Sequence, residues 1–138
     1  MKNFKIFTDE RGQLIPFEFD QLPFEPKRIF IVKDVPKGST RGNHAHYNTQ
    51  QFLVCLSGRI KVYTFNKFEH FKYIILTPGD SYLIPTMCWD NQTFMDDNSV
   101  LLVFCDTKYN KKDYITDYNK FCQIFKKSMY YGPPKNSK

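Results

Sequence analysis

The residues best suited to chemistry are His44 and His46, which are separated by a single alanine. In an extended chain alternate side chains point to the same side, so both imidazoles are predicted to share one face. An imidazole can carry a proton near neutral pH, and it can also bind a transition metal. The pair therefore predicts a site for proton transfer or for a metal. The third histidine, His70, lies in a lysine-rich segment and is expected to face solvent.

The spacing around the pair resembles the first motif of the cupin family, Gly-x5-His-x-His-x3–4-Glu-x6-Gly. Gly38 and Gly58 stand where that motif has its glycines, and Gln51 replaces its glutamate. The second cupin motif would place a histidine near residue 90, where this chain has Asp90. Because metal-binding cupins use both missing side chains, the resemblance implies no metal and no cofactor. A metal-dependent cupin enzyme remains a competing hypothesis.

The elements that must position these residues are predicted to be short strands. Runs rich in β-branched and aromatic residues alternate with turns that contain Gly, Pro, Asn or Asp. The predicted strands are Lys27–Val32, Gln51–Leu56, Arg59–Phe65, Tyr73–Leu76, Ser81–Ile84 and Val100–Phe104. Many short strands favour a β-sandwich or barrel, whose inward side chains can surround a pocket.

Only the end of the chain is predicted to be helical. Ile115, Tyr118, Cys122 and Phe125 have the spacing of one helix face. The net charge of +6 is concentrated here, since residues 1–117 carry 15 basic and 14 acidic side chains, whereas residues 118–138 carry five lysines and no acid. We predict one domain over residues 1–127 and a flexible basic tail over residues 128–138, with no nucleic-acid partner.

Composition supports a β fold and argues against several other classes. Alanine occurs once among 138 residues, and aromatic residues make up 17%, which disfavours a helical bundle. No apolar run approaches the roughly 20 residues that cross a bilayer. No signal peptide is evident, so a cytoplasmic protein without membrane contact is expected. The four cysteines are expected to be reduced core thiols.

Several motifs together resemble the sugar 3,4-ketoisomerases that act on dTDP-4-keto-6-deoxyglucose. They are Lys27-Arg28-Ile29-Phe30, Arg41-Gly42-x-His44-Ala45-His46, Gln51–Leu56 with Gly58, Ile84-Pro85-x3-Trp89 and Lys112-Asp113-Tyr114-Ile115-x2-Tyr118. The resemblance implies an all-β cupin jelly-roll, or double-stranded β-helix, with a C-terminal helix. It also implies a homodimer that exchanges an N-terminal strand. The substrate would be a dTDP-linked keto sugar.

The resemblance also implies roles for individual residues. His44 would be the proton acceptor, with His46 as a second proton carrier or an orienting group. Gln51 is a candidate donor to the charge that develops on the substrate. The candidate groups for the diphosphate are Arg11, Arg28 and Arg41. Trp89 could line the pocket or simply pack in the core.

The reaction implied is migration of the ketone from C4 to C3 through an enediol. Arg11-Gly12 is similar to the members that yield the galacto product, whereas Asp90, expected near the sugar, fits neither the galacto nor the gluco group. Phe30 replaces a tyrosine common in relatives. The product would serve the synthesis of 3-amino-3,6-dideoxy sugars for lipopolysaccharide or another surface glycan. Two further competing hypotheses are a non-catalytic nucleotide-sugar-binding cupin and a 3,5-epimerase.

Overall fold

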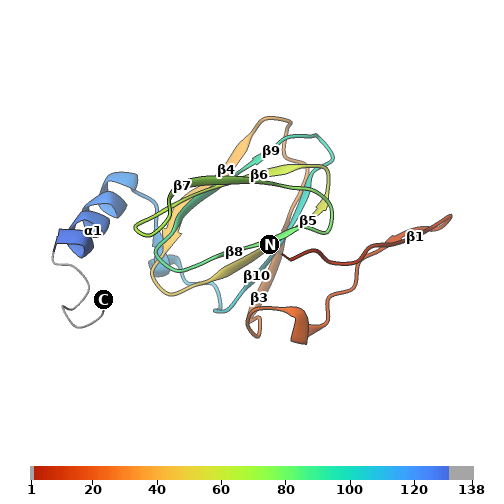
Figure 1. Ribbon diagram of the computed structural model, residues 1–138, viewed down its shortest axis with the longest axis horizontal. Helices are drawn as coiled ribbons and strands as arrows, with labels where there is room; N and C mark the ends of the chain where they lie inside the picture. The colour runs from red at the N-terminus through yellow and green to blue at the C-terminus, as the bar shows by residue number, and fades with distance from the viewer. Residues whose placement is uncertain (1, 131–138) are drawn as a thin grey trace.

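Two antiparallel sheets face each other in a computed structural model that describes residues 2–130 (Figure 1). One sheet has the order β3-β10-β5-β8 and the other β11-β4-β9-β6-β7. The strands are β1 (Phe7–Asp9), β2 (Gly12–Leu14), β3 (Arg28–Val32), β4 (Thr40–His46), β5 (Gln51–Ser57), β6 (Ile60–Asn66), β7 (His70–Leu76), β8 (Ser81–Ile84), β9 (Trp89–Phe94), β10 (Val100–Cys105) and β11 (Tyr114–Ile115). Two 3-10 turns, η1 (Phe19–Gln21) and η2 (Lys111–Asp113), and helix α1 (Tyr118–Tyr130) complete the chain. This is the predicted cupin jelly-roll.

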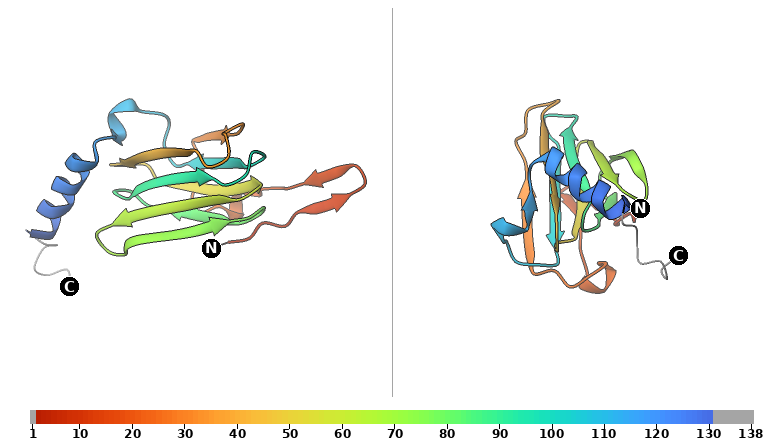
Figure 2. Two further views of the ribbon diagram at one scale, coloured as in Figure 1. Left: turned by 90° about the horizontal axis from the view of Figure 1, so that it is seen from above. Right: turned by 90° about the vertical axis from the view of Figure 1, so that its left-hand side faces the viewer.

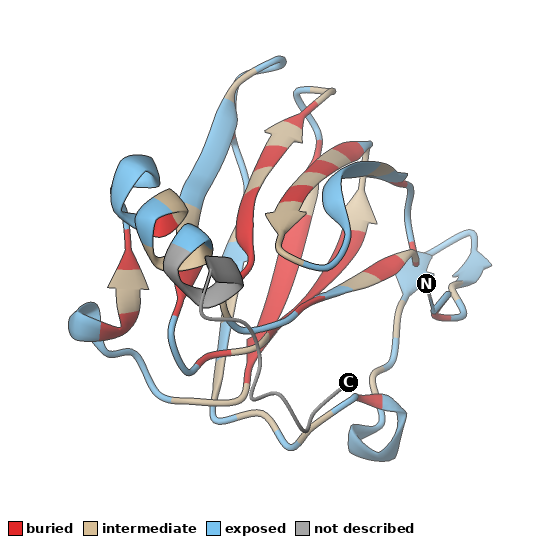
Figure 3. Ribbon diagram, turned by 60° about the vertical axis from the view of Figure 1, so that its left-hand side comes forward, coloured by how far each residue is buried: buried red, intermediate tan, exposed pale blue. Residues whose placement is uncertain are grey.

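The core lies between the two sheets, and the buried residues gather on the strands of the barrel (Figure 3). Period-2 alternation along these strands sends apolar side chains inward. Leu53 and Val103 from one sheet meet Val62 and Phe94 from the other, and all four are at most 2% exposed. Strand β5 is apolar on both faces because the N-terminal segment covers its outer side. There Phe4 and other aromatic rings pack on the sheet at centroid distances of 4.9–6.3 Å.

The N-terminal hairpin and the C-terminal helix extend from opposite ends of the barrel (Figure 2). Hairpin β1–β2 pairs only with itself, in the register Phe7↔Leu14 to Asp9↔Gly12. Its side chains are exposed, including 48% of Phe7 and 61% of Leu14. Among the residues described, no other strand pairs with this hairpin, and Lys5 Nζ lies over the Phe7 ring at 4.7 Å from its centroid.

Helix α1 begins at Tyr118, later than predicted. Asp117 precedes it, and its carboxylate accepts hydrogen bonds from the backbone N–H groups of Asn119 and Lys120. Ile115 is not helical as expected, since it lies in β11 and pairs with Ala45 of β4. The helix continues through Tyr130, so the first three residues of the predicted tail are helical, and residues 131–138 lie outside the described range.

Strand β9 was not predicted, because its sequence Trp-Asp-Asn-Gln-Thr-Phe is mostly polar. It forms because it lies between β4 and β6 and completes the hydrogen-bond ladder of both. All six predicted strands are confirmed to within a few residues, as β3, β5, β6, β7, β8 and β10. No helix in the part of the chain described is long and apolar enough to cross a membrane.

Candidate active site

A β-bulge in β4 determines the direction in which the side chains of the two histidines point. The pairing of β4 with β9 shifts register between Gly42 and His44, and Gly42 and Asn43 have φ angles of 95° and 60°. Without the bulge, residues three apart would point to opposite faces. With it, Arg41 and His44 line the same cavity. The backbone conformation at Gly42 is therefore part of the site.

We expect Gly42→Ala to lower the free energy of unfolding by about 2–4 kcal/mol. The φ angle is unfavourable for alanine, and the new Cβ would lie 3.1 Å from the Asn91 Cα and 3.2 Å from the Asp90 carbonyl oxygen. Gly38→Ala is the matched control, since its φ is 86° but nothing lies within 4 Å of a Cβ there. Urea unfolding measures the free energy of unfolding of both variants. An equal loss in Gly42→Ala and Gly38→Ala would contradict a contribution from crowding at Gly42.

The cavity beside His44 has a volume of about 490 Å³ and lies between the two sheets. Strands β3, β5 and β10 line one side, and β4, β9 and Tyr114 of β11 line the other. Its charged lining residues are Arg28, Lys33 and Arg41, with no Asp or Glu among them. No described carboxylate forms an ion pair with either arginine. Such a cavity is suited to an anionic ligand.

The two histidines sit at different depths. His44 is half-buried and lines the cavity, whereas His46 is 3% exposed and lies behind it. Their ring centroids are 4.8 Å apart in an edge-on arrangement. Burial and the nearby imidazole of His46 lower the pKa of His44 to about 4. Burial also lowers the pKa of His46, against the opposing charge of Asp113. His44 is therefore neutral at pH 7 and can accept a proton.

Two further predicted residues line the cavity with His44. Arg28 lies over the rings of Phe30 and Tyr109, at 4.6 and 5.0 Å from the centroids. Gln51 is 5% exposed, and its amide contacts the Cys105 sulfur at 3.8 Å. The structure thus brings His44, Arg28, Arg41 and Gln51 together from three strands.

Tyr114 is the site residue that sequence reasoning did not single out. Strand β11 pairs with β4 in the register Tyr114↔His46, which places the phenol ring 5.3 Å from the ring centroid of His44 and 4.4 Å from that of His46. The one sequence feature that could have pointed to Tyr114 as a site residue is the motif that contains Lys112-Asp113-Tyr114. Asp113 fixes this segment, because its carboxylate accepts hydrogen bonds from the Asn48 backbone and the Thr49 hydroxyl.

The structure does not place Trp89 in the cavity. Its neighbour Asp90 points into the barrel, so Trp89 points outward and packs beneath α1, with its ring 5.7 Å from that of Phe121. Trp89 is thus a core residue between sheet and helix. Arg11 is also outside the cavity of its own chain. It lies at the turn of the β1–β2 hairpin and forms a 2.6 Å ion pair with Asp9.

Asp90 lies under the cavity rather than in its lining, and it has no solvent exposure. One carboxylate oxygen accepts a 2.6 Å hydrogen bond from Gln92, while the other, Oδ2, has no hydrogen-bond partner among residues 2–130. Burial raises the pKa of Asp90 to about 7. The carboxyl group therefore takes up a proton more readily in the folded chain than in the unfolded one.

We expect Asp90→Asn to raise stability relative to the wild type more at pH 8 than at pH 5. Above pH 7 the folded wild type must hold a buried charge, whereas well below pH 3.8 the carboxyl group is protonated in both states. The stability of the wild type therefore falls as the pH rises through this window, and the asparagine variant does not share the loss. Thermal unfolding at both pH values tests this, with exposed Asp20→Asn as control. The same gain in stability at pH 5 and at pH 8 would contradict this expectation.

Other potential reactive groups are placed unfavourably for chemistry. Burial raises the pKa of the Cys55 and Cys88 thiols to about 12, so they are inert at neutral pH. Within residues 2–130, no three His, Cys, Asp or Glu side chains are grouped so that they could hold a metal ion. His70 is exposed at the start of β7, as expected.

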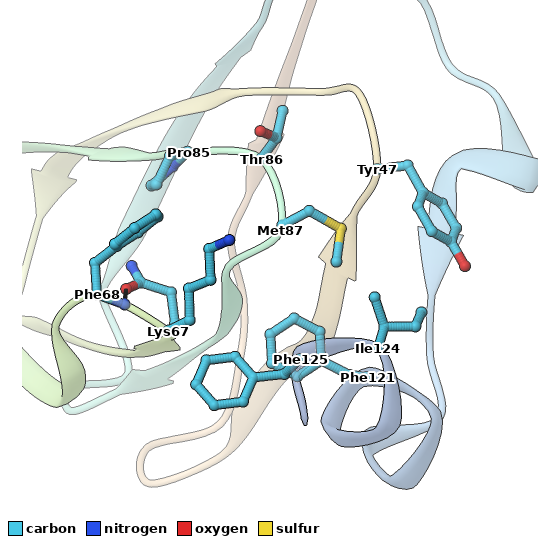
Figure 4. Close-up of a pocket in the computed structure, with 10 residues that line it drawn as sticks. Tyr47, Lys67, Phe68, Pro85, Thr86, Met87, Phe121, Ile124 and Phe125 are labelled. Atoms are coloured by element: carbon cyan, nitrogen blue, oxygen red, sulfur yellow. Dashed lines mark hydrogen bonds between the residues drawn. The ribbon is translucent and has the colours of Figure 1, made fainter. Parts of the chain in front are cut away.

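A second cavity of about 490 Å³ lies outside the barrel (Figure 4). It is lined mainly by apolar side chains from α1, the tip of the β6–β7 hairpin and the loop before β9, including Phe68, Met87, Phe121 and Phe125. None of the described residues that line it is a histidine, Asp, Glu or Arg. We therefore place the chemistry in the barrel cavity.

Solved structures of known enzymes share this architecture. QdtA, a sugar 3,4-ketoisomerase from Thermoanaerobacterium thermosaccharolyticum determined in complex with TDP, gives a TM-score of 0.81 at 32% identity over 93% of this chain and 94% of that chain. A histidine-to-asparagine variant of QdtA has been determined in complex with TDP-4-keto-6-deoxyglucose. WlaRA, a TDP-fucose-3,4-ketoisomerase from Campylobacter jejuni, gives a TM-score of 0.76 at 31% identity. The match covers 90% of this chain and 93% of that chain.

Two further comparisons extend this result. The TDP-4-oxo-6-deoxy-α-D-glucose-3,4-oxoisomerase of Aneurinibacillus thermoaerophilus is 29% identical over 120 residues, which is 86% of each chain. The RmlC epimerase of Mycobacterium tuberculosis, at 15% identity and a TM-score of 0.67, shares the fold alone, over 82% of this chain and 65% of that one.

The barrel and its relatives define the class of protein, a cupin-fold isomerase of the sugar 3,4-ketoisomerase type. The family model described as "FdtA: WxcM-like, C-terminal" matches residues 1–126. The chain belongs to that family.

Proposed function

We propose that this enzyme converts dTDP-4-keto-6-deoxy-D-glucose into the 3-keto-6-deoxy sugar, with the galacto configuration at C4. The observation that carries the proposal is a neutral imidazole, His44, in a cavity whose charged lining residues are all basic. The QdtA complexes with TDP and with TDP-4-keto-6-deoxyglucose support the substrate. The galacto product rests on the similarity of Arg11-Gly12 to members with that outcome.

The chemistry requires a proton to leave C3 and a proton to arrive at C4. His44 can remove the C3 proton as a neutral base and return it at C4 as an imidazolium, through an enediol. The Gln51 amide and the Arg28 guanidinium lie in the same cavity and can stabilise charge on the substrate oxygens. His46 lies behind His44 and is better placed to orient it than to reach the substrate.

No step of this reaction requires a metal ion, because the proton leaves a carbon next to a ketone. The side chains present also fit a metal poorly, since Gln51 and Asp90 stand where metal-binding cupins have a glutamate and a histidine. We therefore propose a metal-independent enzyme. Full activity after dialysis against EDTA would agree with this, whereas loss of activity that is restored by a divalent metal would contradict it.

We further propose a homodimer in which the β1–β2 hairpin of one chain reaches the partner. The hairpin is exposed, and β3 is an edge strand whose outward residues Ile29 and Ile31 are 51% and 57% exposed. Strand β3 also lines the cavity, so a hairpin docked there would bring Arg11 near the substrate. Deleting residues 7–14, which removes the hairpin and keeps Phe4 packed on β5, should give a monomer by light scattering with strongly reduced activity. A deletion variant that remains a dimer would contradict the exchange.

Proton NMR of the enzyme and substrate in deuterated buffer tests the proposed reaction. A 3-keto sugar is expected, with deuterium at C4 in those turnovers in which the His44 imidazolium exchanges its proton with solvent, and the ring couplings distinguish galacto from gluco. Broadened thymidine signals without conversion would instead indicate a non-catalytic nucleotide-sugar-binding protein. Epimerised C3 and C5 centres would indicate a 3,5-epimerase.

We expect kcat/KM to stay nearly constant from pH 7 down to about pH 5 and to fall only as the pH approaches 4. The general base must be neutral, and burial lowers the pKa of His44 to about 4. An unperturbed histidine would lose activity below about pH 6.5. Initial rates after brief exposure to each pH, followed by a return to pH 7 to check reversibility, measure the profile. A decline centred near pH 6.5 would contradict the lowered pKa.

A further inference from the structure

A proton must also move between two oxygens during the proposed reaction. The substrate has a ketone at C4 and a hydroxyl at C3, and the product has these groups exchanged. O4 therefore gains a proton, and O3 loses one. His44 can serve the two carbons, but it holds the carbon-derived proton while the enediol exists, so a second group is needed for the oxygens.

Tyr114 has the geometry for this second role. Its ring lies against both histidines, and it lines the cavity. It carries the only hydroxyl among the described residues that line the cavity. The tyrosine common in relatives is Phe30 here, which also lines the cavity but has no hydroxyl to contribute.

The contact with Arg28 orients the phenol for donation. Arg28 Nη1 donates a 3.4 Å hydrogen bond to the Tyr114 oxygen. Because the phenol accepts from Arg28, its own proton is available to an oxygen of the ligand. The guanidinium, held between Phe30 and Tyr109, can stabilise the phenolate that forms when this proton leaves.

We propose that Tyr114 is a catalytic residue that carries the proton between O4 and O3 of the substrate. This inference rests on the ketoisomerase reaction proposed above. In the first step His44 removes the C3 proton, the C–H electron pair forms the C3=C4 bond, and O4 takes the proton of Tyr114. In the second step the phenolate takes the O3 proton, C3=O forms, and C4 receives the proton from His44. Both residues return to their initial state, so no co-reactant is needed.

Tyr114→Phe tests the role, because it keeps the ring against the histidines and removes only the hydroxyl. We expect kcat to fall about 100-fold or more, while TDP affinity and melting temperature change little. Tyr73→Phe is the matched control, since this 62% exposed residue lies on β7, outside the cavity lining, and should retain wild-type turnover. A Tyr114→Phe variant within threefold of the wild-type kcat would overturn the proposal.

A second substitution, Tyr114→3-fluorotyrosine, keeps the ring and the hydroxyl and makes the phenol more acidic. It should retain turnover and shift the basic side of the kcat–pH profile to lower pH, which a purely structural role would not do. An unshifted profile would contradict the proposal. An inactive wild type would reject the proposed reaction itself, whereas equal rates for an active wild type and Tyr114→Phe reject only the role of Tyr114.

Discussion

Replacing His44 with asparagine is expected to lower kcat by about 1,000-fold or more while leaving TDP affinity within about twofold. Asparagine keeps a polar side chain of similar reach in the half-buried position but cannot accept a proton from carbon. No other lining residue of the cavity is an imidazole or a carboxylate, so within the described part of the chain no neighbouring base can substitute for it.

Turnover of TDP-4-keto-6-deoxyglucose and titration with TDP separate the two effects. His70→Asn is the matched control, because this histidine is exposed on the β6–β7 hairpin and should tolerate the same change. Wild-type turnover by the His44→Asn variant would exclude His44 as the base. Equal losses of turnover and of TDP binding would instead indicate that the substitution damages the cavity.

Arg41→Met is expected to weaken TDP binding about 10- to 100-fold. Hydrogen bonds to charged groups contribute about 1.5–3 kcal/mol, and methionine keeps much of the aliphatic bulk without the charge. Arg41 lies at the cavity beside the β4 bulge, where no described carboxylate neutralises it, so its charge is available to a diphosphate.

Isothermal titration with TDP at two salt concentrations measures the effect, because loss of a phosphate contact should also reduce the dependence of affinity on ionic strength. Arg59→Met provides the comparison, since Arg59 pairs with Asp96 at the surface through two 2.9 Å hydrogen bonds. Unchanged TDP affinity in Arg41→Met would remove this residue from the binding site.

The strands could be predicted wherever local pattern and tertiary environment agree. Runs such as Gln51–Ser57 are apolar because both faces of β5 are covered. Strand β9 could not be predicted, because its polar residues are extended only through pairing with β4 and β6. The helix start was misplaced because Ile115 has helical spacing relative to Tyr118 but pairs with a strand that is distant in sequence.

The site was predicted as far as local spacing could determine it. His44, Arg41 and Gln51 come from neighbouring segments, and the structure brings them to one cavity with Arg28. The direction of the Trp89 side chain depends on which face of β9 points inward. Because β9 was not predicted, the sequence could not show that Trp89 points outward. Tyr114 depends on the two-residue strand β11, whose partner lies far away in the sequence.

Among the described residues, none from helix α1 lines the barrel cavity, yet the helix holds the neighbours of residues that we assign to the reaction. Its Phe121 packs in one cluster with Ala45, Trp89 and Ile115. Each of these three adjoins an inward-facing group: Ala45 separates the two histidines, Trp89 precedes Asp90, and Ile115 follows Tyr114. The helix therefore packs against β4, β9 and β11 together and stabilises their relative positions. Selection for precise catalysis should accordingly constrain Phe121, although this residue does not line the barrel cavity.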